Sequence, residues 1–233
     1  MNHSYDNLLF DADGTLYDWE KTEHKTVELL WEEFKFPKDS IQTYIRLSCN
    51  AWEDFSSGSL AIEDLHPRIF KEFINEIGYN HLDPKIISDK YLQAQIDFLY
   101  FYDQSREVLQ ELKSRGYHIY IATNGIPIDR FTKHKEEGLF EDVFYAQVIH
   151  SYKPQKDYFE KIFQILNLDE EGKRKTVMIG DSLKSDIQGG ANAGLTTVWF
   201  NRNGKYPYPV EPVKPDYEIH ELKELLQLFP KKQ

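Results

Sequence analysis

The chain has 233 residues, of which 40% are hydrophobic and 29% charged, so it can bury one core and carry an insertion. Its formal net charge of −11 argues against a nucleic-acid polymer or a membrane surface as its main partner, because both are negatively charged. The single cysteine, Cys49, excludes an internal disulfide, and the sequence contains no signal-peptide pattern and no apolar run that could span a bilayer. We therefore expect a cytoplasmic protein.

Hydrophobic periodicity changes twice along the chain. Residues 5–10 are expected to form a strand, because they end in the apolar run 8–10 that is typical of a buried strand, whereas residues 20–101 show only helical spacing. After residue 103, strand and helix patterns alternate. The expected strands are residues 118–122, 143–147, 176–179 and 196–200, and the expected helices are residues 106–114, 129–136, 156–166, 183–193 and 221–228.

This alternation predicts an α/β fold, with a parallel sheet covered by helices on both faces. The helical block interrupts the pattern after the first strand, so we expect an inserted all-helical cap. The predicted core is residues 1–18 with 103–233, and the predicted cap is residues 19–102. Breaks between the cap helices are expected at Pro37, residues 56–59 and residues 78–84.

Two carboxylates follow the first expected strand directly. Asp11 and Asp13 are two residues apart and precede Gly14, which allows the chain to turn sharply. Side chains at the ends of parallel strands point to the carboxyl edge of the sheet, where α/β folds bind ligands. A carboxylate there can act as a nucleophile, a metal ligand or a general acid, and two carboxylates in different environments can divide these tasks.

Two further polar clusters follow the next strands. Thr123, Asn124 and Gly125 suit hydrogen bonds to phosphate oxygens, although the same triplet is also ordinary turn chemistry. Lys153 comes before Pro154, which suits the first turn of a helix, so Lys153 would lie at a helix N-terminus, where anions bind favourably. Taken alone, this lysine is better explained as a solvated surface residue.

Asp181 and Asp186 form the last cluster. Asp181 leaves the expected strand at residues 176–179, and Asp186 falls in the first turn of the next helix. A carboxylate in that turn can simply stabilise the helix dipole. Each later cluster therefore has an ordinary explanation by itself, but all of them lie at the predicted carboxyl ends of strands in one sheet.

In the order Asp-x-Asp, Thr, Lys and Gly-Asp-x₄-Asp, the clusters resemble the motifs of the haloacid dehalogenase superfamily of aspartate-nucleophile phosphotransferases. The resemblance covers nearly the whole chain, including a helical cap after the first motif, and it implies a Rossmann-like core. It also implies that Asp11 is the nucleophile that forms an aspartyl-phosphate. Asp13 would protonate the leaving oxygen and later take a proton from the hydrolytic water.

The resemblance further implies a phosphate site and a Mg²⁺ site. The implied phosphate contacts are Thr123, Asn124, Gly125 and Lys153, of which Thr123 and Lys153 are also catalytic. Mg²⁺ would be held by the Asp11 carboxylate, the Asp13 backbone carbonyl and Asp181. Asp186 would mainly lie next to these ligands rather than bind the ion itself. Independently of the family, a phosphate dianion cannot approach four carboxylates without a cation, and a divalent ion with oxygen ligands suits such a site.

A finer resemblance concerns the substrate. Residues 180–194 and 197–201 resemble the bacterial pyrimidine 5′-nucleotidase branch, and the cap contributes Asn50, Trp52 and Arg68. Trp52 could stack on a base, and Asn50 could bond to the edge of the base or to the sugar. The alternative is that Trp52 fills the helical core of the cap and that Arg68 forms a surface salt bridge.

We therefore expect a Mg²⁺-dependent phosphomonoester hydrolase, with a nucleoside 5′-monophosphate as the leading substrate. A sugar-phosphate or phosphoglycolate-type phosphatase or a phosphomutase of the same superfamily is the alternative enzyme. Asp13 argues against a dehalogenase, whose chemistry has no alcohol to protonate. If the protein is not an enzyme, the alternative is a phosphate-binding interaction protein. The sequence does not indicate an oligomeric state.

Overall fold

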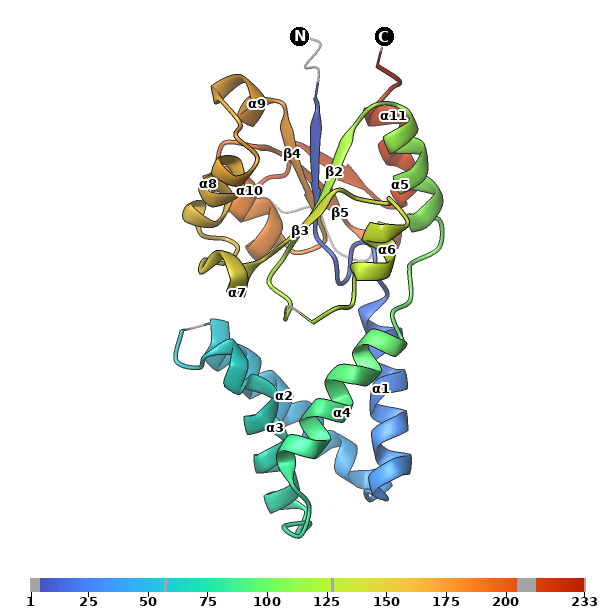
Figure 1. Cartoon of the computed structure of the whole chain (residues 1–233), viewed down its shortest axis with the longest axis vertical. Helices are drawn as coiled ribbons and strands as arrows, with labels where there is room; N and C mark the ends of the chain where they lie inside the picture. Colours follow the sequence, from blue (N-terminus) through green and yellow to red (C-terminus); the bar gives the residue numbers. More distant parts are fainter. Residues whose placement is uncertain (1–4, 57, 127, 205–212, 233) are drawn as a thin grey trace. The chain divides into compact units, whose positions relative to one another are not determined.

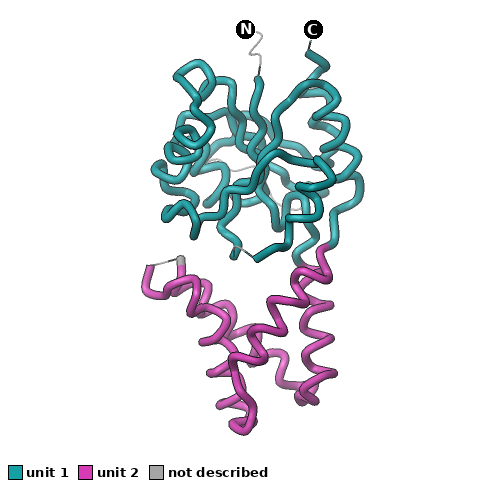
Figure 2. Tube along the Cα trace, in the orientation of Figure 1, with its two compact units in different colours: residues 1–19, 100–233 teal, residues 20–99 magenta. Residues whose placement is uncertain are grey.

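The computed structural model describes residues 5–56, 58–126, 128–204 and 213–232. The chain divides into two compact units (Figure 2). Residues 1–19 and 100–233 form the first, which we call the core unit, and residues 20–99 form the second, which we call the helical unit.

The core unit contains a fully parallel sheet of six strands in the order β3-β2-β1-β4-β5-β6 (Figure 1). The strands are β1 (Asn7–Phe10), β2 (His118–Thr123), β3 (Asp142–Tyr145), β4 (Thr176–Gly180), β5 (Thr196–Phe200) and β6 (Tyr217–Ile219). Each neighbouring pair is parallel, so the predicted sheet is confirmed. Because β2 and β4 flank β1 on opposite sides, the strand order reverses beside β1. In parallel α/β sheets this is the position where ligands bind.

Helices cover both faces of this sheet, as Figure 1 shows. Helices α5 (Ser105–Ser114) and α11 (Leu225–Leu228) lie on one face, and α8 (Lys156–Ile165) and α10 (Gln188–Asn192) lie on the other. The side chains of Leu8, Leu9 and Phe10 in β1 are fully buried. A central strand covered on both faces is expected to be largely apolar, which explains the hydrophobic run at residues 8–10 of β1.

Several boundaries differ from the sequence-based expectation. The expected strand at residues 143–147 ends at Tyr145, where α7 (Ala146–Ile149) begins, and the expected helix at residues 129–136 is shortened to α6 (Thr132–Glu136). The expected helix at residues 183–193 starts as the π-helical turn η2 (Leu183–Ile187). Short elements that the sequence did not predict are β6, α9 (Glu170–Arg174) and η3 (Arg202–Gly204), and the last helix opens with the 3₁₀ turn η4 (Leu222–Glu224). Periodicity cannot resolve such short segments, because they contain little more than one turn.

The helical unit is built from α1 (Trp19–Phe34), η1 (Lys38–Ser40), α2 (Ile41–Ser56), α3 (Ile62–Glu76) and α4 (Pro84–Asp97). The breaks between them fall where the sequence predicts, although Ser57 lies outside the described residues. Helix α4 begins where the Asp83 side chain accepts a hydrogen bond from the Lys85 N–H and Pro84 occupies the first turn. In the described part of the chain, no helix combines the length and the apolar character needed to cross a bilayer.

Candidate active site

Asp11 lies at the carboxyl end of β1, at the point where the strand order reverses. Its backbone N–H donates a hydrogen bond of 2.8 Å to the Ile179 carbonyl, which continues the pairing of β1 with β4. Its side chain is only 12% exposed. The chain therefore turns away from the sheet with the Asp11 carboxylate buried at the edge.

Lys153 binds this carboxylate directly. Its Nζ lies 2.7 Å from Asp11 Oδ1, 2.7 Å from Asp186 Oδ1 and 2.6 Å from the Ala122 carbonyl oxygen. These contacts use all three N–H donors of the ammonium group, whose side chain is 1% exposed. Burial alone would lower the pKa of Lys153, but the charges of Asp11 and Asp186 outweigh burial and raise the pKa. Lys153 is therefore a fixed positive charge, and not a solvated surface lysine.

Asn124 holds the loop that carries Lys153. Its Nδ2 donates to the Lys153 carbonyl, and its Oδ1 accepts from the Lys153 N–H, both at 2.9 Å. Helix α8 begins at Lys156, as expected, so Lys153 lies in a turn before the helix rather than at the helix N-terminus that the sequence predicted. The side chain of Asn124, predicted as a substrate contact, thus fastens the end of β2 to the lysine loop.

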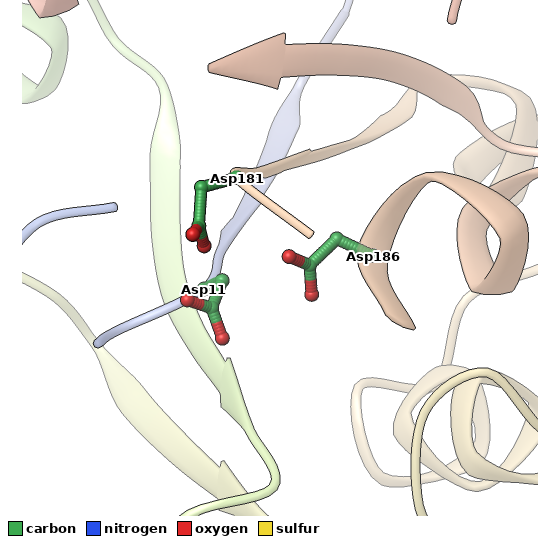
Figure 3. A group of neighbouring side chains, drawn as sticks. All are labelled: Asp11, Asp181 and Asp186. Carbon is green, nitrogen blue, oxygen red and sulfur yellow. The ribbon is translucent and has the colours of Figure 1, made fainter. Parts of the chain in front are cut away.

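Three carboxylates gather beside the ammonium group. One oxygen from each of Asp11, Asp181 and Asp186 lies within 4.8 Å of the others (Figure 3). Burial, and then the charges of Asp186 and Asp181, raise the pKa of Asp11 well above its ordinary value, although Lys153 opposes this shift. Burial and the charge of Asp186 raise the pKa of Asp181 to about 6. Asp181 is the exposed member of the group, so water screens part of this repulsion.

Two residues of the turn after β1 position Asp181. Thr15 Oγ1 donates to Asp181 Oδ1 at 3.2 Å and accepts from the Asp181 N–H at 3.0 Å. Gly14 has φ +93°, and a Cβ at this position would come within 2.6 Å of Asp181 Oδ2. Only glycine allows this close approach, because any larger residue would displace the carboxylate.

The donor set fits a divalent cation. Three carboxylates share one ammonium group, which leaves uncompensated negative charge in a largely buried place. Hard divalent ions such as Mg²⁺ prefer oxygen ligands of this kind. Asp186 is already engaged, because its Oδ1 accepts from Lys153 and its Oδ2 accepts from the Ser182 N–H at 3.0 Å. Asp11 and Asp181 are therefore the side chains best placed to hold an ion.

Asp13 has a partner that sequence reasoning missed. The guanidinium group of Arg130 donates to both of its carboxylate oxygens, with Nη1 2.9 Å from Oδ2 and Nη2 2.7 Å from Oδ1. Nearby, Thr123 Oγ1 accepts a hydrogen bond of 2.9 Å from the Gly125 N–H. No sequence motif marks Arg130, which falls inside a stretch that periodicity assigned to a helix.

The three residues predicted as cap contacts lie in the helical unit and differ in environment. Asn50 is exposed on α2. The Trp52 ring makes edge-to-face contacts with Phe55, at 5.7 Å between centroids, and with His66, at 6.5 Å. Arg68 forms ion pairs with two carboxylates on the same unit, those of Asp54 at 2.7 Å and Glu72 at 2.9 Å. Arg68 thus forms the salt bridges that the alternative interpretation describes, and Trp52 makes the aromatic contacts expected of a packing residue.

Residues 5–194 match a family model described as haloacid dehalogenase-like hydrolase, so the chain belongs to the haloacid dehalogenase-like hydrolases, as its motifs predict. Members of this family that resemble the chain are named as phosphatases and 5′-nucleotidases, and the chain is a phosphoric monoester hydrolase.

Similarity to individual proteins extends over nearly the full chain. It is 31% identical to the pyrimidine 5′-nucleotidase PynA of Streptococcus pneumoniae, covering 97% of this chain and 96% of PynA. It is 24% identical to the pyrimidine 5′-nucleotidase YjjG of Escherichia coli, covering 95% and 98%. The HAD-hydrolase YfnB of Bacillus subtilis is 30% identical over 97% of this chain and 95% of YfnB. A crystal structure of YfnB bound to magnesium superposes with a TM-score of 0.82 at 29% identity, covering 97% and 99% of the two chains.

Proposed function

We propose that this hydrolase is a Mg²⁺-dependent nucleoside 5′-monophosphate phosphatase that works through an aspartyl-phosphate on Asp11. The observation that carries the proposal is the buried contact of Lys153 with Asp11 and Asp186, at 2.7 Å each. A fixed ammonium group beside a carboxylate favours its ionised form over the protonated one and fixes its orientation, both of which serve a nucleophile. The same charge offsets the negative charge of a phosphoryl group.

The reaction has two steps. In the first, an oxygen of Asp11 attacks phosphorus, the ester P–O bond breaks, and Asp13 gives its proton to the departing alkoxide. In the second, water attacks the phosphorus of the aspartyl-phosphate, its proton passes to Asp13, and inorganic phosphate leaves as Asp11 is restored. Thr123 and the backbone N–H groups near Gly125 hydrogen-bond the phosphoryl oxygens. Positioning and charge neutralisation supply most of the rate enhancement in phosphoryl transfer.

The carboxylates of Asp11 and Asp181 and the backbone carbonyl of Asp13 would hold Mg²⁺. When bound, the ion supplies the positive charge that lets a phosphate dianion approach this acidic group. Asp186 contributes indirectly, because both of its oxygens already accept hydrogen bonds from the protein. YfnB, with the same fold, has been crystallised bound to magnesium.

The nucleotide preference is supported by similarity to PynA and YjjG, both named as pyrimidine 5′-nucleotidases. Asn50 and Trp52 remain our candidates for recognising the base or sugar. Arg68 is less suited to this task, because two carboxylates already occupy its guanidinium group.

A phosphate-release screen over nucleoside monophosphates and sugar phosphates tests the proposal. We expect release that requires Mg²⁺, is abolished by EDTA, and is greatest with a nucleoside monophosphate. Asp11→Asn should remove turnover, whereas Asp157→Asn, which alters an exposed carboxylate paired with Lys161, should not. Higher turnover of small sugar phosphates would refute the nucleotide preference alone. Formation of an isomeric phosphate without inorganic phosphate would indicate a mutase instead.

A further inference from the structure

The contact between Arg130 and Asp13 is the strongest feature of the core unit to which the family motifs assign no role. It is a bidentate ion pair between residues 117 positions apart, in which Nη1 and Nη2 of Arg130 bind different carboxylate oxygens of Asp13. The Arg130 side chain is 5% exposed and that of Asp13 is 24% exposed. A buried arginine that uses its planar fork on one carboxylate fixes the plane of that carboxylate as well as its position.

The structure around Arg130 holds its guanidinium group in place. Its backbone N–H donates to the Ile128 carbonyl at 2.7 Å, and Tyr145 Oη donates to the same carbonyl at 3.2 Å. Its Cζ lies 5.2 Å from the centre of the Phe131 ring, which is buried and contacts the rings of Tyr17 and Tyr145. Arg130 is thus anchored in a packed aromatic cluster.

The ion pair holds Asp13 on the side of the predicted phosphate contacts. The position that a Cβ would occupy on Gly125 lies 3.6 Å from Asp13 Oδ2 and 3.0 Å from Thr123 Oγ1. The held carboxylate and the Thr123 hydroxyl therefore both lie close to a position that glycine leaves open. Each carboxylate oxygen keeps a further lone pair beyond its bond to Arg130.

We propose that Arg130 is a positioning residue, which holds the Asp13 carboxylate where it exchanges protons with the leaving oxygen and the hydrolytic water. This inference rests on the proposed phosphatase mechanism. Misplacing a catalytic group by about 1 Å can cost on the order of 10²-fold in rate. Lysine cannot restore the geometry, because its ammonium group lacks the planar fork.

The test compares Arg130→Gln and Arg130→Lys with the wild type on two Mg²⁺-loaded reactions. Uridine 5′-monophosphate has an alkoxide leaving group that needs a proton, whereas p-nitrophenyl phosphate has a leaving group that does not. We expect kcat/KM for uridine 5′-monophosphate to fall by about 10²-fold in both variants, and kcat/KM for p-nitrophenyl phosphate by less than about tenfold. Arg106→Gln, which breaks an exposed ion pair with Glu137 on the same unit, should change neither value.

A double-mutant cycle with Asp13→Asn separates positioning from direct substrate binding. If Arg130 acts through Asp13, Arg130→Gln should cause no further loss of kcat/KM in the Asp13→Asn background. The inference would be overturned if Arg130→Gln lowered kcat/KM equally for both substrates, or if its loss of kcat/KM persisted in the Asp13→Asn background. Arg130 would then bind phosphate directly, or its replacement would cause a folding defect. Thermal melting of each variant distinguishes these two explanations.

Failure of the inference differs from failure of the proposed function. If Asp13→Asn strongly lowers kcat/KM for uridine 5′-monophosphate while Arg130→Gln has the same kcat/KM as Arg106→Gln, only the role of Arg130 is wrong. If wild-type protein hydrolyses neither ester with Mg²⁺, the phosphatase mechanism and the inference fall together.

Discussion

Replacing Lys153 with methionine should destabilise the core unit strongly. Methionine fills similar space but removes the three hydrogen bonds to Asp11, Asp186 and the Ala122 carbonyl. Removing one partner from a buried ion pair typically costs about 3–5 kcal/mol, because the remaining charge stays buried without compensation. Against a domain stability of about 5–15 kcal/mol, this loss is large.

The size of the loss should depend on pH. Burial already raises the pKa of Asp11, and without the opposing charge of Lys153 this pKa rises further. A carboxyl group whose folded pKa exceeds its unfolded value binds protons more tightly in the folded state. Stability is therefore retained at low pH and is lost as pH rises through the folded pKa. The cost of Lys153→Met should be greatest near pH 8 and smaller near pH 5.

Urea unfolding in EDTA, followed by far-UV circular dichroism at both pH values, measures this effect. Lys156→Met is the matched control, because Lys156 is exposed and lies 3.7 Å from its partner Glu160. Adding Asp186→Asn to Lys153→Met should recover part of the loss by removing one unpaired charge. A cost for Lys153→Met below about 1 kcal/mol at pH 8, or one that does not shrink at pH 5, would refute the electrostatic explanation.

Three further predictions concern other positions. Asn124→Ala breaks both hydrogen bonds to the backbone of Lys153 and should lower the free energy of unfolding by about 1–3 kcal/mol. We expect kcat to fall as well. An unchanged urea midpoint would contradict a stabilising role for these two bonds. Gly14→Ala should weaken Mg²⁺ binding, measured by calorimetry, because its Cβ would displace Asp181. Gly194→Ala, also at positive φ but with no atom within 4 Å of its Cβ, should bear only the backbone cost, so equal effects of both variants on Mg²⁺ affinity would contradict this reasoning. Burial lowers the pKa of His66 to about 4, so the unfolded chain takes up a proton there that the folded protein excludes. The free energy of unfolding of the wild type should therefore fall by about 3 kcal/mol more than that of His66→Phe between pH 7 and pH 4. Urea unfolding at both pH values measures this, and an equal fall in the two proteins would contradict the prediction.

The sequence by itself determined the layout of this protein. Apolar runs that alternate with helices predict a parallel sheet, because the central strands of such a sheet are buried on both faces and are therefore largely apolar. The carboxyl ends of parallel strands share one edge, so polar residues that follow each strand must approach one another there. For this reason the proximity of Asp11, Lys153 and Asp181 could be expected before any coordinates.

Only the tertiary structure decided which side chains bind each other at that edge. Arg130 binds Asp13 across 117 residues, and Asn124 holds the backbone of Lys153 across 29. Neither pairing leaves a local pattern, because the sequence shows the residue types but not the directions in which folded loops point their side chains. Arg68 shows the same limit, since its resemblance to a substrate contact gave no sign of its two carboxylate partners. The topology of a parallel sheet determines which polar residues gather at its carboxyl edge. Which of them form ion pairs depends on distances between side chains, and these are set only when the chain has packed.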